Sequence, residues 1–157
     1  MNKNLIFGII IGIILVGAIY SLVKTPFKES KLSGLEFVVY KTPTCGCCKE
    51  YIGYLKMNGA NVKVNEVSDE ELIKIKNQFG IPQGLWSCHT VLLGNYFIEG
   101  HVPIEAIQKL LTEKPDIDGI ALPGMPSGSP GMPGFKIYPF KIHSVKNGED
   151  KGIFMEI

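Results

Sequence analysis

The sequence predicts an α/β domain with a mixed sheet, preceded by an apolar segment and followed by a Pro/Gly-rich loop and a hairpin. Strand-like and helix-like patterns alternate from residue 35 to residue 115, which is typical of strands joined by helical crossovers. An uncharged apolar run stands before these patterns, and Pro and Gly become frequent after them. We therefore expect four parts: an anchor at 1–23, a linker at 24–34, the domain at 35–115 and an extension at 116–157.

The run from Leu5 to Val23 predicts one transmembrane helix. It has no charged residue, and about 19 residues at ~1.5 Å each come close to spanning a ~30 Å hydrocarbon core. A cleaved signal peptide is the alternative, but the run is long for a signal core and no small-x-small site follows it. Pro26 and Gly34 in the following polar stretch suit a tether. Lysines are more numerous after the run than before it, and their count alone would keep the domain in the cytoplasm.

The first half of the domain predicts a strand, a helix and a second strand. The run Phe37–Tyr40 is apolar and flanked by charge, as in a strand that is buried on both faces. Apolar residues then recur at helical spacing over Cys48–Leu55, and Gly59 is well placed to end that helix. The segment Val62–Val64 alternates in polarity like a half-buried strand.

The second half of the domain predicts a helix and a hairpin. Ser68 and Glu71 form a capping-box pattern ahead of an apolar helical stripe. Gly94-Asn95 is a two-residue turn signal, and it separates the apolar runs Thr90–Leu93 and Tyr96–Ile98. These two runs are therefore expected to form an antiparallel pair.

A last helix is expected from Pro103, a residue favoured at the first helical position, to just before Pro115. The predicted order is then β-α-β-α-β-β-α. A helix between the first two strands makes them parallel, with a right-handed crossover, whereas the hairpin makes the last two antiparallel. This is the order of a thioredoxin-like domain, and Cys45-Gly46-Cys47-Cys48 stands where that fold carries its active site.

The extension predicts a loop and a terminal hairpin. Leu122–Gly134 is a Pro/Gly-rich loop that carries Met125 and Met132. Beyond it, Tyr138–Val145 and Ile153–Ile157 are expected to pair as a hairpin through the Asn-Gly turn signal between them.

The cysteine turn, residues 45–48, holds three of the four cysteines of the chain. At a helix N-terminus thiolates are favoured, and thiolates are the form that reacts and that binds metals. Three interpretations follow: a soft-metal site, a redox pair in which Cys45 attacks and Cys48 resolves, or a structural disulfide such as Cys48 to Cys88. Helical spacing turns Cys48 inward and leaves Cys45 exposed. We favour the metal site, because Cys47 is surplus to a redox pair but supplies a further soft ligand.

Other residues predict further ligands. Cys88-His89 directly precedes the third strand, and a thioredoxin-like topology brings this position close to the cysteine turn. The thiol and the imidazole would raise the number of possible ligands to five, which is more than one ion needs. By its position alone, His101 is expected to have a loop or capping role, and His143 to be a surface residue. Met125 and Met132 either pack the loop or bind Cu(I), which thioethers select, whereas zinc prefers cysteine, histidine and carboxylate.

Charge and motifs exclude several classes of function. The net charge is +1, and all sixteen basic residues are lysines without a basic stripe, which argues against nucleic-acid binding. No paired-acid, Ser-His-Asp, Walker or dinucleotide pattern is present. A non-enzymatic role is therefore favoured, and the enzymatic alternative is a thiol–disulfide oxidoreductase that uses Cys45 and Cys48.

Four ordered motifs resemble the bacterial and archaeal family known as domain of unknown function 411. The likeness extends from about Glu36 to the C-terminus. The motifs are Val39-Tyr40-Lys41-Thr42-Pro43-Thr44-Cys45-Gly46-Cys47-Cys48, Ser87-Cys88-His89-Thr90, Glu99-Gly100-His101-Val102-Pro103, and Pro123-Gly124-Met125-Pro126 through Gly131-Met132.

The resemblance implies a thioredoxin-like, metal-binding protein that is exported and linked to copper handling. It carries over these metal-binding positions: Cys45, Cys47, Cys48, Cys88, His89, His101, Met125 and Met132. Redox-active thioredoxins place a cis-proline before the third strand, but here Cys88-His89-Thr90 holds that place, a departure associated with metal capture. The expectation is a membrane-anchored, extracytoplasmic protein that buffers Cu(I), or zinc as the second candidate, or passes it to a copper-handling partner.

Overall fold

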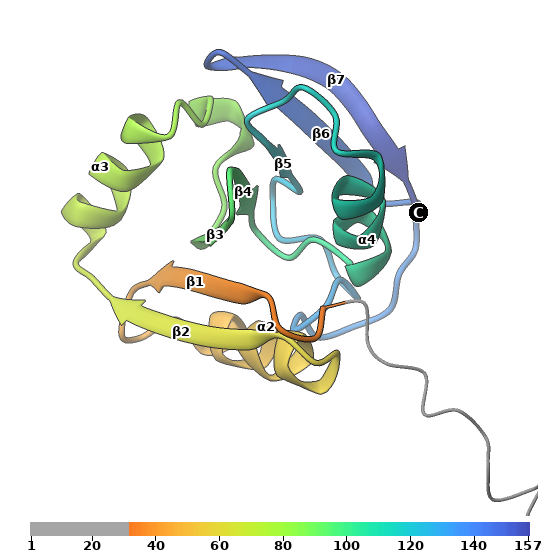
Figure 1. The fold of residues 1–157 in the computed structure, drawn as a ribbon. Coiled ribbons are helices and arrows are strands. Elements are labelled where there is room, and N and C mark those ends of the chain that lie inside the picture. Colours follow the sequence, from red (N-terminus) through yellow and green to blue (C-terminus); the bar gives the residue numbers. More distant parts are fainter. Residues whose placement is uncertain (1–31) are drawn as a thin grey trace, which may run out of the picture.

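In a computed structural model, residues 32–157 form a seven-stranded sheet and three α-helices (Figure 1). The elements are β1 (Glu36–Lys41), α2 (Gly46–Met57), β2 (Asn61–Glu66), α3 (Asp69–Gln78), the 3-10 turn η1 (Gln83–Leu85), β3 (His89–Leu93), β4 (Tyr96–Glu99), α4 (Ile104–Glu113), β5 (Gly119–Ala121), β6 (Lys141–Lys146) and β7 (Glu149–Glu156). The structure describes residues 32–157 only, so the predicted anchor at Leu5–Val23 and most of the linker lie outside it. Within residues 32–157 no helix has the length and apolar character needed to cross a membrane.

The predicted β-α-β-α-β-β-α order is confirmed. β1 pairs parallel with β2 and antiparallel with β3, and the Gly94 turn joins β3 to its antiparallel partner β4. Ser68 is confirmed as the N-cap of α3, since the Glu71 amide donates a hydrogen bond to the Ser68 hydroxyl at 3.2 Å, which is one of the two bonds of the predicted capping box. The β1–β3 register places Lys41 opposite His89. The end of β1 and the start of β3 therefore meet at the same end of the sheet.

The extension continues this sheet rather than standing apart from it. The sheet order is β2-β1-β3-β4-β5-β6-β7, with β5 parallel to β4 and β6 antiparallel to β5. The predicted terminal hairpin is confirmed as β6 and β7. Strand β5 was not predicted, because three residues are too few to show a periodic pattern. Its Gly119 lies so close to Phe97 that an added Cβ would sit 2.5 Å from the aromatic ring.

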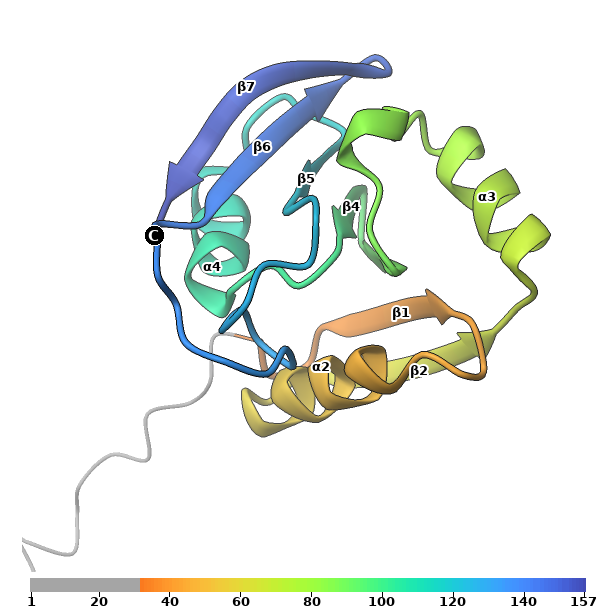
Figure 2. The same cartoon turned by 180° about the vertical axis from the view of Figure 1, so that it is seen from behind.

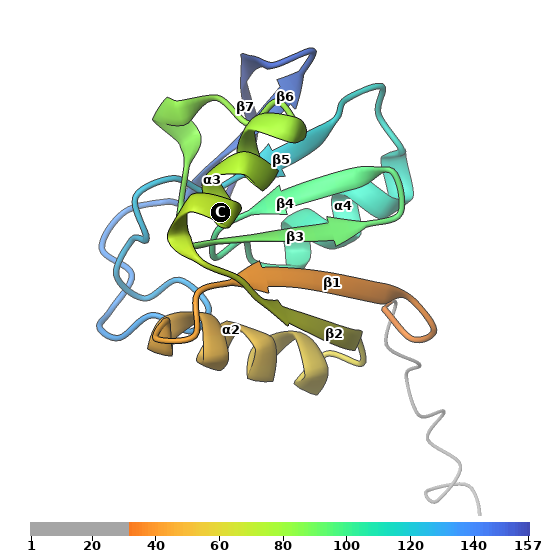
Figure 3. The same cartoon turned by 90° about the vertical axis from the view of Figure 1, so that its left-hand side faces the viewer.

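The helices cover both faces of the sheet. α3 lies on one side of β3 to β5 and α4 on the other, as Figures 1 and 3 show. α2 and α4 share one apolar core that includes Leu55, Val91 and Leu110, and the fully buried Leu32 belongs to it. A smaller core on the α3 side contains Ile81, Leu85, Phe97, Ala121 and Val145.

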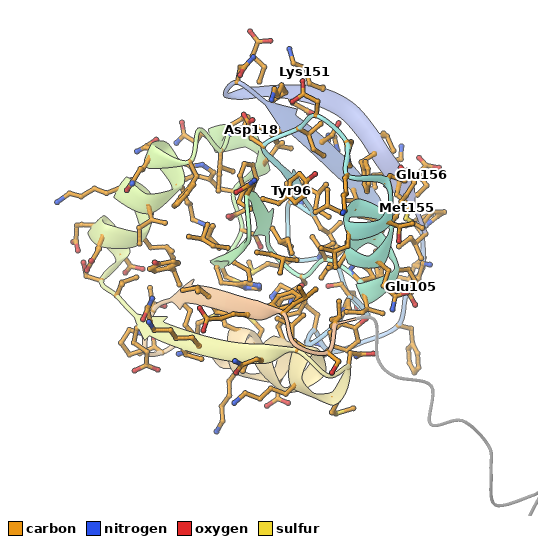
Figure 4. All side chains as sticks on the ribbon, in the orientation of Figure 1. Tyr96, Glu105, Asp118, Lys151, Met155 and Glu156 are labelled. Atoms are coloured by element: carbon orange, nitrogen blue, oxygen red, sulfur yellow. A yellow bond between two sulfur atoms is a disulfide. The ribbon has the colours of Figure 1, made fainter. Side chains whose placement is uncertain are left out.

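Tyr96 lies at the end of the sheet where α4 finishes. Its ring extends from β4 toward the α4 side (Figure 4), and its hydroxyl donates a 3.1 Å hydrogen bond to the Pro115 carbonyl. The cysteine turn lies at the opposite end of the sheet, between the end of β1 and the start of α2.

Candidate metal centre

The cysteine turn begins helix α2. Cys45 is the N-cap residue, and its amide donates a hydrogen bond to the Thr42 carbonyl at 3.2 Å. Cys48 is fully buried, as predicted, but Cys45 is half-buried rather than exposed. The reason is a disulfide between Cys45 and Cys48, whose Cα atoms lie 5.4 Å apart. Cys47 and Cys88 are free thiols, so the alternative Cys48–Cys88 disulfide is not the one formed.

Cys88 brings a fourth sulfur to the turn from the start of β3. The Cys47 sulfur lies 3.6 Å from that of Cys45 and 3.7 Å from that of Cys88. The Cys48 sulfur lies 3.6 Å from the Cys88 carbonyl oxygen. All four sulfurs lie within 4.8 Å of one another. The structure therefore unites the two cysteine motifs that the sequence keeps 40 residues apart.

Two imidazoles meet the same Cys88 sulfur. That sulfur lies 3.3 Å from Nδ1 of His89 and 3.1 Å from Nε2 of His101. His101 is fully buried and stands edge-on to the His89 ring, 4.9 Å away, so the loop or capping role expected from its position alone does not describe it. Cys88 is shared by a four-cysteine group and by a Cys88–His89–His101 group.

A backbone carbonyl sets the tautomer of His101. Its Nδ1 lies 2.7 Å from the Pro130 oxygen, and a carbonyl oxygen only accepts hydrogen bonds. The proton is therefore on Nδ1, and the Nε2 lone pair faces the Cys88 sulfur. Metal-binding histidines are commonly oriented in this way, by a hydrogen bond from the nitrogen that does not bind the metal.

Burial controls the protonation of the site. Desolvation lowers the pKa of His89 far below its usual value, with further lowering from His101 and Lys76, and burial likewise lowers the pKa of His101. Desolvation, with a contribution from the neighbouring Cys47, raises the pKa of Cys88 to about 12. At neutral pH the imidazoles are neutral, which is their metal-binding form, whereas Cys88 must lose its proton when a metal binds.

The donor set fits a soft cation. Both groups consist of sulfur and imidazole nitrogen, without a carboxylate, and such ligands suit Cu(I) and zinc rather than magnesium or calcium. Nε2 of His89 is buried and has no hydrogen-bond partner among residues 32–157. An unpaired buried polar atom costs about 1–3 kcal/mol. The donor atoms present thus fit a bound metal ion, whereas their mutual hydrogen bonds leave Nε2 of His89 without a partner among residues 32–157.

The methionine loop passes over the cysteine turn. Figure 2 shows the chain running from β5 past the start of α2 before it returns to β6. At Gly131 the backbone approaches α2 so closely that an added Cβ would lie 2.6 Å from the Tyr51 nitrogen and 3.0 Å from the Cys47 oxygen. The half-buried Met132 follows directly, whereas Met125 is exposed. Ligation by these two methionines stays a prediction.

Two residues around the site have roles that the sequence did not reveal. Tyr51 packs against His89, with ring centroids 4.7 Å apart and the ring planes tilted by 38°, and its hydroxyl donates to the Val102 carbonyl. Pro130 supplies the carbonyl for His101. The helical spacing over residues 48–55 does not single out Tyr51, and a backbone carbonyl such as that of Pro130 cannot be recognised in a sequence. His143 lies apart from this site, on β6, half-buried and 2.9 Å from Asp150.

The chain is similar to one protein family and to two solved structures. A family model described as "Protein of unknown function, DUF411" matches residues 85–132, which include Cys88, His89, His101 and both loop methionines. Two solved structures, titled copper resistance protein CopG in forms 1 and 2, are each 36% identical to the chain with a TM-score of 0.69. Each alignment covers 78% of this chain, and 98% of the form 2 chain or 97% of the form 1 chain. No curated protein matches the chain at a significant level.

The contact between the loop and α2 predicts a large effect of Gly131→Ala. Gly131 and Gly124 have the same left-handed φ, +79° and +78°, but Gly124 has no atom within 4 Å of an added Cβ. Gly131→Ala should therefore cost about 1–3 kcal/mol more unfolding free energy than Gly124→Ala, because only the first forces the loop off α2. Urea denaturation measures both, and Cys47 should be alkylated faster in Gly131→Ala. Equal losses would show that the close approach contributes nothing.

Proposed function

Since the chain belongs to the DUF411 family, whose solved relatives are titled copper resistance proteins, we propose that it binds copper as Cu(I). The observation that carries the proposal is the gathering of three further cysteine sulfurs and two imidazoles around the sulfur of Cys88. Thiolates select Cu(I), zinc and iron–sulfur clusters among metals. Relatives at 36% identity that are titled for copper resistance favour copper among these.

The chain's own residues would hold the ion in a defined way. Cys47 and Cys88 are free thiols in position to bind, and His101 presents Nε2 while Pro130 holds its other nitrogen. Cys45 and Cys48 would bind only after an external dithiol, itself oxidised to a disulfide, has reduced their disulfide to two thiols. Both free thiols are half-buried, which leaves them within reach of a partner. This arrangement suits a protein that buffers copper or transfers it.

Anaerobic titration of the reduced full chain with Cu(I), against a chromophoric competitor, tests the proposal. We expect a dissociation constant tighter than about 1 μM, and at least a tenfold loss in Cys47→Ser and in Cys88→Ser, which corresponds to about 1.4 kcal/mol each. His143→Ala is the matched control, because His143 lies outside both ligand groups. Absent binding, or full affinity in Cys88→Ser, would refute the proposal. A higher affinity for zinc than for Cu(I) in a parallel titration would identify zinc as the metal instead of copper.

A second candidate function is thiol–disulfide exchange, which the Cys45–Cys48 disulfide favours. We infer a thioredoxin-like fold from the strand order β2-β1-β3-β4 and from the position of the disulfide at the start of α2. In the exchange, the Cys45 thiolate attacks a substrate disulfide and forms a mixed disulfide, and one substrate thiolate leaves. Cys48 then displaces the other, and an external dithiol must restore the reduced pair. A groove of about 430 Å³ beside Cys45, lined also by Pro43 and Lys49, offers room for a substrate chain.

Insulin reduction with dithiothreitol as electron donor separates the two functions. If exchange is the function, turnover should exceed the rate of dithiothreitol alone, fall to that rate in Cys45→Ser and stay unchanged in His89→Ala. A copper-binding protein without this activity should show no turnover above dithiothreitol in any variant.

We propose that the domain lies outside the cytoplasm on an N-terminal anchor. The support is the uncharged run at 5–23 and the kind of compartment in which disulfides persist. Reporters fused to the C-terminus test this location: alkaline phosphatase, which needs disulfides, should be active, and a cytoplasm-dependent fluorescent reporter inactive. The reverse pattern would place the domain in the cytoplasm.

A further inference from the structure

A buried ion pair stands next to the metal centre but contributes no ligand to it. Nζ of Lys76 on α3 lies 2.5 Å from Oε1 of Glu99 on β4, and the two side chains are only 4% and 0% exposed. Removing two charges from water costs several kcal/mol per ion, and apolar side chains of similar volume often replace such a pair without loss. The pair is thus poorly explained by stability alone.

Glu99 has two further partners besides Lys76. The Ser87 amide donates to Oε1 at 2.6 Å, and the Thr90 hydroxyl donates to Oε2 at 2.6 Å. Lys76 also donates to the Thr90 hydroxyl oxygen at 3.0 Å. The carboxylate therefore receives charge-assisted hydrogen bonds from three segments of the chain, and such bonds are about twice as strong as neutral ones.

The two backbone positions held by Glu99 flank the Cys88-His89 dipeptide. Successive residues of a strand point to opposite faces, so Thr90 faces α3 while His89 faces Tyr51 on α2. Thr90 and Glu99 are also paired across β3 and β4. Glu99 thus accepts hydrogen bonds from Ser87, which precedes Cys88, and from Thr90, which follows His89. It does so from the face of the sheet opposite the cysteine turn.

The same carboxylate lies two residues before His101. Between them, the Gly100 amide donates to the His89 carbonyl at 3.2 Å. Gly100 also packs against Ser87 so tightly that an added Cβ would lie 2.7 Å from the Ser87 hydroxyl. The segment after β4 that carries His101 and the segment before β3 that carries Cys88 are therefore held together next to Glu99.

We propose that Glu99, with its charge balanced by Lys76, is a positioning residue that holds Cys88, His89 and His101 in the geometry that binds the metal. The inference rests on the proposed copper function. Among residues 32–157, the Glu99 carboxylate is hydrogen-bonded to no candidate ligand side chain, and it acts through the Ser87 amide and the Thr90 hydroxyl. We call this set of contacts the carboxylate clamp: Glu99, Lys76, Ser87 and Thr90.

Two double variants of the full, reduced chain separate the clamp from its charge. Glu99→Leu with Lys76→Met removes the charges and the hydrogen bonds together. Glu99→Gln with Lys76→Met also removes the charges, but the amide oxygen still accepts from Ser87, and Thr90 can bond the amide nitrogen. Neither leaves an unpaired buried charge. Val145→Ala, a fully buried site in the same apolar core as Phe97, controls for general loss of stability.

The leucine variant should lose about 10–100-fold in Cu(I) affinity, the range typical when a residue that orients metal ligands is removed. Its thiolate-to-copper absorption band should shift, and in copper-free protein its Ser87 amide should exchange hydrogen faster. The glutamine variant should regain affinity to within about threefold of the wild type, with Ser87 protected. Val145→Ala should keep affinity and spectrum even where its melting temperature matches that of the leucine variant.

Other results would overturn the clamp. Wild-type affinity and spectrum in a folded leucine variant would show that the geometry does not depend on Glu99. An equal loss in Val145→Ala of matched stability would reduce the effect to general destabilisation. Absence of Cu(I) binding by the wild type itself would instead refute the copper function, and the clamp's role with it.

Discussion

The antiparallel register of β1 against β3 is the constraint on which the site depends. It pairs Lys41 with His89, so the cysteine turn after β1 and Cys88 before β3 meet at one end of the sheet. A shift of one residue would turn His89 away from α2 and carry Thr90 into its place. The apolar residues of β1 and β3 in the main core hold this register, because Phe37, Val39 and Val91 are fully buried there.

Short-range patterns predicted most of the fold. The N-cap at Ser68, the Gly94 turn and the helical spacing from Cys48 to Leu55 each depend on residues a few positions apart, and each is confirmed. Strand β5 was missed because its three residues form a strand only through pairing with β4 and β6. The strand order expected from the sequence also predicted that Cys88-His89 would approach the cysteine turn, which the sulfur distances bear out.

The remaining features of the site depend on long-range contacts that no local pattern records. His101 looked like a capping residue, since nothing nearby in the sequence shows that Pro130 and Cys88 surround it. The helix N-terminus predicts thiolates only for the cysteines of the turn at residues 45–48. Cys88 approaches from another strand, and burial raises its pKa to about 12. In the metal-free site Cys88 is therefore a neutral thiol at pH 7, and a cation would supply the charge that stabilises its thiolate.

The hydrogen bond from His101 to the Pro130 carbonyl connects the docking of the methionine loop with the binding of an ion. A cation held by Nε2 of His101 would withdraw electron density from the ring and would make the Nδ1–H group a better donor to that carbonyl. Loop docking and ion binding would then share a coupling free energy, and reciprocity requires that each strengthen the other by the same factor. Pro130 and Gly131 are adjacent, so the tightened bond would act directly where the backbone meets α2. The loop would thus report the loading state of the site to the outer surface of the protein.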